Sequence, residues 1–235
     1  MAQKKLQRFA DIKTFSNVLE YPGDMKGKWH SFFSNSNPIV LELACGRGEY
    51  TVGLSKLFPD TNFIGVDVKG NRIYIGAKKC LEDKISNAAF LRTQITLLPD
   101  YFNGEEVNEI WITFPDPQLR TSKAKKRLTH PKFLRLYQQF LVPNGNIHLK
   151  TDSPDLYDFT KMVISMYGLD LHEDYDDVYS NNSIPPELQI KTYYETLDIA
   201  NSNKIHYLRF SLPSSDLPEM DDVLKERIYN HEKIN

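Results

Sequence analysis

Short apolar runs recur along most of the chain and are separated by longer stretches of mixed polarity. The runs are four to six residues long and rich in β-branched and aromatic residues, a composition typical of buried strands. Five of them are predicted as strands: residues 38–43, 62–67, 89–93, 109–114 and 146–149.

Between these runs, apolar residues recur at helical spacing. Helices are predicted over residues 49–58, 72–81, 131–141 and 154–167, with a short helical stretch from residue 95. Thr129 is the expected N-cap of the helix over 131–141. Strands that alternate with helices in this way imply right-handed crossovers and a mostly parallel sheet.

Two late runs, residues 169–173 and 205–212, bring the predicted sheet to seven strands, the last of them antiparallel. They flank residues 181–195, a segment too long for a simple turn and of a length typical of functional loops. The predicted fold is therefore α/β: a doubly wound, mostly parallel seven-stranded sheet of the Rossmann-like kind, with helices on both faces.

The same pattern divides the chain into three parts. Residues 1–37 are expected to form a mobile basic arm and a covering helix, residues 38–218 one domain, and residues 219–235 a charged tail with helical character. The N-terminus lacks the apolar stretch of a signal peptide, and no run reaches the length of a membrane span. Cys45 and Cys80 form no disulfide framework, so we expect a cytoplasmic protein.

Composition is ordinary for a soluble globular protein, with 40% hydrophobic and 26% charged residues, but the charge is unevenly placed. Residues 117–151 contain eight Lys or Arg and no Asp or Glu, whereas the whole chain carries −2. The remaining residues therefore sum to −10. The basic run within this window, Lys123, Lys125, Lys126 and Arg127, is predicted to contact RNA phosphates, although most charge runs are only solvated surface.

Asp116 lies between Pro115 and Pro117, at the end of the strand predicted over 109–114. The prolines end the strand and restrict the backbone of the residue between them. A stiffened carboxylate beside a cationic segment is not what folding alone requires, which makes Asp116 the first candidate for a role in chemistry.

Polar residues also follow the other predicted strands, and in open α/β sheets ligands bind beyond the carboxyl ends of the strands. These residues are Asp67, Arg92, Thr93 and Asp152, with Glu42 one pleat before its strand ends. Glu42 lies inside an apolar run and needs hydrogen-bond donors. Amides of the following turn are one source, and a cationic or amino-bearing ligand is the other.

The turn Ala44-Cys45-Gly46-Arg47-Gly48 connects the first predicted strand to a helix and resembles nucleotide-binding turns. Thr51 occupies the position where a dinucleotide fingerprint has its third small residue, and Glu49 places negative charge where a pyrophosphate would lie. S-adenosylmethionine (SAM), which has no phosphates, suits this turn better. Asp67 lies 21 positions after Gly46, near the offset at which an acid meets ribose hydroxyls. Helix capping is the alternative role for Asp67.

Metal and covalent mechanisms receive no support from the sequence. The six histidines show no metal-ligand spacing with one another or with the two cysteines. Neither serine nor cysteine lies in a nucleophile-elbow pattern.

Several motifs together resemble the bacterial tRNA (guanine-N7-)-methyltransferases, which methylate a variable-loop guanosine at position 46 with SAM. The most specific are Phe114-Pro115-Asp116-Pro117 and, after the basic run, Arg127-Leu128-Thr129-His130-Pro131. Lys150-Thr151-Asp152 and Thr192-Tyr193-Tyr194-Glu195 follow in the family's order. The resemblance extends from about residue 39 to residue 210.

The resemblance implies that Glu42, Asp67 and Thr93 contact SAM and that Asp116 lies at the reaction centre, in contact with the cofactor. Ala44, Gly46, Gly48 and Arg92 complete the predicted cofactor site. Residues implied to hold the tRNA are Arg120, Asp152, Thr192, Tyr193, Tyr194 and Glu195. The chain departs from the family pattern at Ala44 (often Gly, and tolerable if its φ stays negative), Thr93 (Asp or Asn), Gln118 (Trp) and Arg120 (Lys).

Guanine N7 carries a lone pair and no proton, so transfer to it needs positioning and charge stabilisation rather than a general base. Asp116 is therefore expected to orient the guanine and to stabilise the positive charge that develops on it. Two alternatives remain open: a SAM-dependent methyltransferase for a small molecule or a protein, and a non-catalytic RNA-binding scaffold. The sequence does not discriminate between a monomer and a homodimer.

Overall fold

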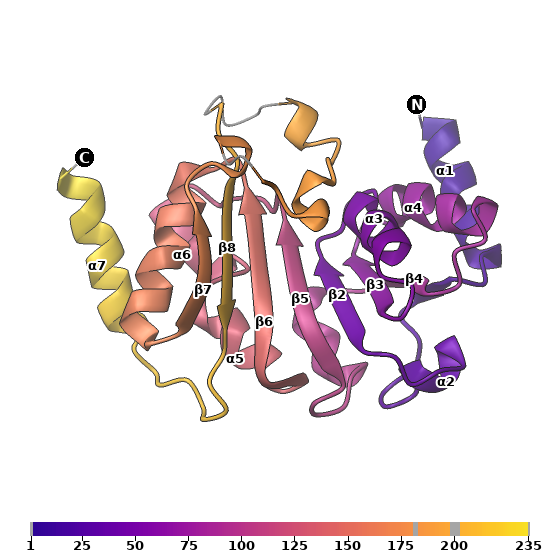
Figure 1. Ribbon diagram of the computed structural model, residues 1–235, viewed down its shortest axis with the longest axis horizontal. Coiled ribbons are helices and arrows are strands. Elements are labelled where there is room, and N and C mark those ends of the chain that lie inside the picture. The colour runs from indigo at the N-terminus through magenta and orange to yellow at the C-terminus, as the bar shows by residue number, and fades with distance from the viewer. Residues whose placement is uncertain (1, 181–182, 198–202, 235) are drawn as a thin grey trace.

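A single eight-stranded sheet runs through the computed structural model, which describes residues 2–180, 183–197 and 203–234 (Figure 1). Its strands are β1 (Val18–Glu20), β2 (Ile39–Leu43), β3 (Asn62–Asp67), β4 (Ala88–Arg92), β5 (Val107–Thr113), β6 (Leu141–Thr151), β7 (Asp170–Tyr175) and β8 (His206–Ser211). Their order across the sheet is β1-β4-β3-β2-β5-β6-β8-β7.

The predicted α/β fold is confirmed. Strands β1 to β6 pair in parallel, and the last strand, β8, is antiparallel to both of its neighbours. The carboxyl ends of β2, β5 and β6 therefore meet at the upper edge of the sheet in Figure 1, where the orange segment after β7 also lies. This edge is where the strand-end rule places a ligand.

The strand count needs one correction, from seven to eight. The additional strand, β1, has only three residues, all half-buried, and pairs with β4 at the edge of the sheet. It belongs to the part predicted as a mobile arm, which instead contains helix α1 (Ala2–Asp11) packed on α4 and a fully buried Ile12. The proposed division of the chain at residues 37 and 218 stays a prediction.

A second correction concerns the helix predicted over residues 131–141. Helix α5 (Pro131–Tyr137) is shorter, because Leu141 already begins β6 and pairs with Val107. Its N-cap is His130, whose Nδ1 accepts from the backbone N–H of Lys132 at 3.1 Å. Burial lowers the pKa of His130 to about 4, so the neutral ring can accept. The expected cap, Thr129, instead hydrogen-bonds Thr160 at 2.8 Å.

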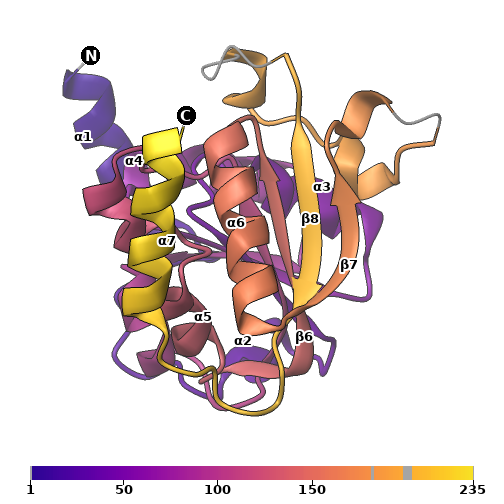
Figure 2. The ribbon, with the colours of Figure 1, turned by 90° about the vertical axis from the view of Figure 1, so that its left-hand side faces the viewer.

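One face of the sheet is covered by α2 (Trp29–Phe33), α5, α6 (Pro154–Tyr167) and α7 (Asp221–Ile234). Figure 2 shows α6 and α7 side by side on this face, so the tail does form the expected helix. Trp29, Leu41, Ile112, Leu149 and Phe159 are among the side chains of this main core. The N-terminal and C-terminal ends of the chain lie at opposite ends of the long axis (Figure 1).

The other face is covered differently along its width. Helices α3 (Glu49–Leu57) and α4 (Gly70–Glu82) pack over β2, β3 and β4. Over β5 and β8, short 3-10 turns take their place, η4 (Val178–Ser180) and η5 (Pro186–Gln189), through Val178 and Leu188. The remaining short helices are η1 (Ile12–Thr14), η2 (Ile95–Asp100), η3 (Thr121–Lys126) and η6 (Glu195–Leu197). No helix in the described residues is both long enough and apolar enough to cross a membrane.

Candidate active site

A pocket of about 700 Å³ opens at the carboxyl edge of the parallel strands. Its lining brings together Asp67 after β3, Asp116 after β5 and Asp152 after β6, three residues that the sequence placed at strand ends. The other lining residues are Ala44, Val68, Lys69, Arg72, Phe114, Pro115, Pro117, Leu119, Ser153, Pro154, Asp155 and Tyr194. The volume is in the range of small-molecule sites.

The glycine turn between β2 and α3 has three residues with left-handed backbone conformation. Gly46 has a φ of +57° and Gly48 a φ of +71°, and a Cβ at Gly48 would lie 2.5 Å from the Phe90 ring. Ala44 also has a positive φ, +55°, so the condition under which alanine would be tolerated here, a negative φ, is not met. An L-residue in this region is strained by about 1–2 kcal/mol, so the turn holds Ala44 in a conformation that glycine would adopt freely.

Asp67 fastens this turn to the end of β3. Its Oδ2 accepts from the backbone N–H of Gly46 at 3.0 Å, and its Oδ1 accepts from that of Lys69 at 2.8 Å. The second bond closes a turn just before α4, whose N-cap is Lys69, so Asp67 does not cap the helix as the alternative proposed. The side chain is 8% exposed and still lines the pocket, so the same carboxylate can also receive ligand hydroxyls.

Glu42 is buried beneath the turn, not on the pocket wall. Thr51 donates its backbone N–H (2.7 Å) and its hydroxyl (2.6 Å) to Oε2, and the Thr113 hydroxyl donates to Oε1 at 3.0 Å. An amide of the helix after the turn therefore supplies one of the donors that Glu42 requires. Burial raises the pKa of Glu42 to about 7 despite these bonds.

The two polar residues after β4 have different surroundings. Thr93 is buried next to Asp67, donating its backbone N–H to the Asp67 carbonyl at 3.2 Å. Within the described residues its hydroxyl has no hydrogen-bond partner, which is unusual for a buried polar atom. Arg92 instead forms an ion pair with Glu20 and donates to the Val68 carbonyl at 3.2 Å, so it connects β4 to the strand β1 outside the pocket lining.

These residues fit a cationic cofactor without phosphates. Four carboxylates line the pocket (Asp67, Asp116, Asp152 and Asp155) against two cationic side chains, Lys69 and Arg72. A sulfonium is favoured by such a balance and a pyrophosphate is not. Glu49, the first residue of α3, accepts from the Tyr193 backbone N–H at 3.3 Å and places negative charge at the start of the helix, which disfavours a pyrophosphate there.

Asp116 is exposed to the pocket on a loop with unusual backbone geometry. Phe114 and Gln118, on either side of the two prolines, have φ values of +47° and +49°. The Asp116 Oδ1 accepts from the backbone N–H of Gln118 at 3.0 Å, which orients the carboxylate. Strained backbone of this kind clusters at functional sites, where the surrounding structure maintains it.

Of the basic residues after this loop, Lys123, Lys125 and Lys126 are exposed, as is Arg120. Arg127 is only 4% exposed and donates to the carbonyls of Pro117 (3.1 Å) and Gln118 (3.3 Å), with its guanidinium 4.5 Å from the centre of the Phe159 ring. A side chain this buried cannot reach a bound RNA in this conformation, which corrects our expectation for Arg127. Arg127 therefore supports the Asp116 loop from inside the protein.

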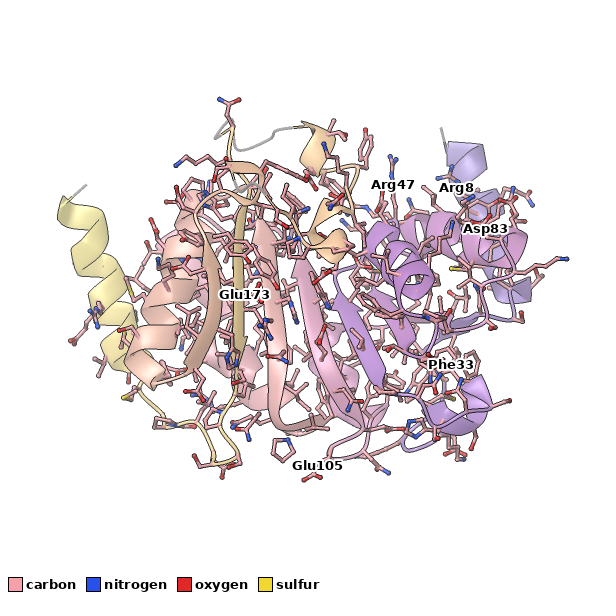
Figure 3. The ribbon with its side chains drawn as sticks, viewed as in Figure 1. Arg8, Phe33, Arg47, Asp83, Glu105 and Glu173 are labelled. Atoms are coloured by element: carbon pink, nitrogen blue, oxygen red, sulfur yellow. The ribbon has the colours of Figure 1, made fainter. Side chains whose placement is uncertain are left out.

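In the Thr192-Tyr193-Tyr194-Glu195 motif, the two tyrosines are accessible, whereas the Thr192 and Glu195 side chains are buried. Thr192 is buried and accepts from the Glu195 backbone N–H at 3.1 Å, whereas the Glu195 carboxylate pairs with Lys150. Tyr194 lines the pocket, and the guanidinium of Arg47 lies 3.5 Å from the centre of the Tyr193 ring (Figure 3 labels Arg47). Thr192 and Glu195 therefore fix the segment instead of facing a ligand.

Sequence reasoning did not find Lys150, Lys69 or Arg72. A cationic residue at the end of an apolar strand is a recognisable pattern, but Lys150 enters the prediction only as part of the Lys150-Thr151-Asp152 motif. Lys69 and Arg72 fall at the start of α4, and nothing in their spacing marks them as pocket residues. Among the described residues, no group of three or more His, Cys, Asp or Glu is arranged to hold a metal ion.

Comparison with solved structures shows the fold. The crystal structure of the 16S rRNA methyltransferase KamB superimposes with a TM-score of 0.60, covering 80% of this chain and 93% of that one at 15% sequence identity. The structure of an antibiotic-related methyltransferase gives the same TM-score over 85% of this chain and 98% of that one, at 14% identity. The fold of this chain is therefore the one that these two methyltransferase structures share.

Sequence comparison is more specific. A family model described as a putative methyltransferase matches residues 36–208. The tRNA (guanine-N(7)-)-methyltransferase of Bacteroides fragilis (strain YCH46) is 47% identical over 246 residues, which cover 99% of this chain and 97% of that protein. The enzyme of the same name from Porphyromonas gingivalis (strain ATCC BAA-308 / W83) is 49% identical and covers 87% of this chain and 88% of its own length. The chain belongs to the tRNA (guanine-N(7)-)-methyltransferase family.

Proposed function

We propose that this protein transfers the methyl group of SAM to N7 of the guanine at position 46 in the variable loop of tRNA, in the cytoplasm. The observation that carries the proposal is the position of Asp116. Its exposed carboxylate lines the same pocket as Asp67 and the glycine turn, and the exposed lysines Lys123, Lys125 and Lys126 follow it in the chain. The features expected of a cofactor site and of an RNA-binding surface therefore both lie next to the Asp116 carboxylate.

Bound SAM supplies an electrophilic methyl group on a sulfonium. Asp67 holds the ribose hydroxyls with the lone pairs that Gly46 and Lys69 leave open. The unpartnered Thr93 hydroxyl, buried beside Asp67, provides a hydrogen bond to the adenine side. Glu42 acts beneath the turn, where its bonds to Thr51 hold the first turn of α3 against β2.

Asp116 acts on the guanine. Its carboxylate accepts hydrogen bonds from the guanine N1–H and amino groups, the two donors on that edge of the base, and leaves N7 toward the methyl donor. Positive charge develops on the purine as the methyl group arrives, and a preoriented carboxylate lowers the energy of that state. The target base leaves its stacked position to reach the pocket.

The tRNA is held around this centre by the surface next to the pocket. Lys123, Lys125, Lys126 and Arg120 contact phosphates without reading sequence. Asp152 and Tyr194 line the pocket itself, so they contact the extruded nucleotide. Tyr193 presents an exposed ring beside them, suited to stacking.

The test is incubation of the protein with methyl-labelled SAM and a tRNA transcript that carries guanine at position 46. We expect label in 7-methylguanosine at that position. Two matched transcripts serve as controls: one with adenine at position 46, and one with 7-deazaguanine, which keeps the N1–H and amino donors but has no N7. Label in both controls, or in protein but not in tRNA, would contradict the proposal, and SAM binding without any transfer would favour a scaffold.

A further inference from the structure

Lys150 is the fully buried cation at the end of β6, with a side chain that is 0% exposed. Its ammonium donates to the carbonyls of Leu188 (2.9 Å) and Ile190 (3.1 Å) and to Oε2 of Glu195 (3.1 Å). An ammonium has three N–H donors, so this site satisfies all of them. An apolar side chain would occupy this position of the strand at lower desolvation cost. Packing of the strand alone therefore does not account for a buried and fully paired charge.

Glu195, the charged partner, is itself held on two sides. Its side chain is 5% exposed, and Oε1 accepts a hydrogen bond from the Tyr179 hydroxyl. Burial lowers the pKa of Lys150, and the Glu195 charge opposes that shift. The rings of Tyr50, Phe114 and Tyr179 lie within 5.7 Å of the Lys150 ammonium, so they exclude water around the pair.

Lys150 holds both ends of a short segment, because its ammonium bonds Ile190 and Glu195. The positions of the residues between these two are therefore restricted as well. Tyr193 lies against the glycine turn through Arg47 and Glu49. Tyr194 lies directly over Gly46, where a Cβ would be 3.5 Å from its ring. Tyr194 therefore lies in the pocket wall next to the glycine turn.

The backbone of Lys150 reaches the opposite wall. Its carbonyl accepts from the Phe114 backbone N–H at 2.8 Å, at the point where β5 turns into the Asp116 loop. One residue therefore joins the two parts of the pocket. Its main chain sets where the Asp116 loop starts, and its side chain sets where the segment with Tyr194 lies.

We propose that Lys150 is a positioning residue for methyl transfer, which fixes residues 188–195 so that Tyr194 closes the pocket opposite Asp116. This rests on the proposed function. Lys150 does not line the pocket and touches no reacting group, so it acts only through the segment that it holds.

The first test is the variant Lys150→Met, which keeps most of the length of the side chain and removes the ammonium. We expect kcat with tRNA to fall about 10- to 100-fold because the segment is displaced, while the Kd for SAM changes less than 3-fold. Hydrogen exchange should show lost protection at the amides of residues 188–195. The matched control is Lys161→Met on α6, whose exposed lysine pairs with Asp174 at 2.6 Å and which should leave all three measurements unchanged.

Glu195→Gln is the second variant and keeps the test decisive if Lys150→Met does not fold. It preserves the shape of the side chain but removes the charge, so a smaller loss of turnover and of protection is expected in the same segment. Wild-type turnover and protection in the variants that fold would overturn the positioning role. Failure of the unmodified protein to methylate tRNA would instead overturn the proposed function, and the two failures are therefore distinguishable.

Discussion

The pocket has a cofactor wall, with Asp67 and the glycine turn, and a substrate wall, with Asp116 and its loop. The two walls differ in how many of their polar groups are buried and already hydrogen-bonded within the protein. Asp67 in the cofactor wall and Glu42 beneath it are buried, and both oxygens of each accept protein hydrogen bonds. In the substrate wall Asp116 is exposed, and Lys123, Lys125 and Lys126, which follow it in the chain outside the pocket lining, are exposed as well. The first wall is preorganised for a small ligand, whereas the second presents unburied charge that a large polyanion can cover.

Both walls contain strained backbone, but the strain is supported in different ways. Ala44, with a φ of +55°, is held by a turn whose Gly46 N–H is fixed by Asp67. Phe114 and Gln118 are held by prolines and by the guanidinium of Arg127 beneath the loop. The comparison teaches that the cofactor wall is stabilised by a carboxylate at the end of a strand, while the substrate wall also depends on Arg127, a support outside the sheet.

The largest expected effect is on the substrate wall. Asp116→Asn should lower kcat about 100- to 1,000-fold, because the amide cannot accept both guanine donors or stabilise the developing charge. The Kd for SAM and the Tm should stay close to wild type, since the side chain is exposed and an asparagine can also accept from Gln118. Single-turnover methylation and calorimetry measure the two quantities.

The control for this change is Asp60→Asn, an exposed aspartate on the loop between α3 and β3. It should leave turnover unchanged. Equal turnover by Asp116→Asn and the wild type would remove the proposed role of that carboxylate and the contrast between the two walls.

The next largest effect concerns Glu42, beneath the cofactor wall, and is a change of protein stability with pH. Burial raises the pKa of Glu42 to about 7 from an unfolded value near 4.5. Between these values the folded state binds more protons, so the stabilising contribution is complete below pH 4.5 and is lost as the pH rises through 7. The difference in unfolding free energy between wild type and Glu42→Gln should therefore fall by about 3 kcal/mol over this range. Urea unfolding at a series of pH values measures it.

Glu109 on β5 gives the matched comparison, because its pKa is shifted in the opposite direction. Burial raises the pKa of Glu109, but the hydrogen bond and charge of His148 outweigh burial and lower it. The difference between wild type and Glu109→Gln should therefore be steady at neutral pH and decrease as the medium is acidified. The same pH slope for both variants would show that Glu42 is not the source of the effect.

A smaller effect is expected from the exposed lysines. Replacing Lys123, Lys125 and Lys126 together with glutamine should raise the KM for tRNA about 10-fold and reduce the slope of log KM against log salt by about 2–3 units, with kcat little changed. Steady-state kinetics over a range of salt concentrations measure both quantities. The control is the same replacement at Lys78, Lys79 and Lys84, which are exposed near the far end of α4. An equal rise in KM for both triple variants would mean that the surface after Asp116 is not the tRNA site.

The sequence predicted the sheet and most of the pocket because both follow from local rules. Apolar runs identify strands wherever they are buried, and the carboxyl ends of parallel strands share one edge. Asp67, Asp116 and Asp152 could therefore be assigned to one pocket before any coordinates were known. The strand β1 has only three residues, too few for an apolar pattern to identify it.

Other features could not be predicted because they depend on tertiary contacts. Arg127 has the same charge as its lysine neighbours, and only the packing of the Asp116 loop on Phe159 shows that it is buried. The partners of Lys150 lie 38 to 45 residues later in the chain, beyond β7. The positive φ of Ala44 likewise belongs to a turn that is bonded to Asp67, 21 residues after Gly46, and the identity of the alanine does not indicate it.

The smallest expected effect tests that strain directly. Ala44→Gly should stabilise the protein by about 0.5–1 kcal/mol, because relief of the left-handed conformation exceeds the extra entropy of glycine in the unfolded chain. For a chain of 235 residues this raises Tm by about 2–3 °C, which differential scanning calorimetry resolves. The KM for tRNA should not change, because the substrate wall has its own supports.

The same substitution at Ala77, inside helix α4, is the control, since that alanine lies fully buried in an ordinary helix. Ala77→Gly should destabilise the protein by about 1 kcal/mol or more. If Ala44→Gly also destabilised it to that extent, the positive φ would not be a source of strain. The cofactor wall would then gain its rigidity from packing of the alanine methyl group, and not from the hydrogen bonds that Asp67 makes with the turn.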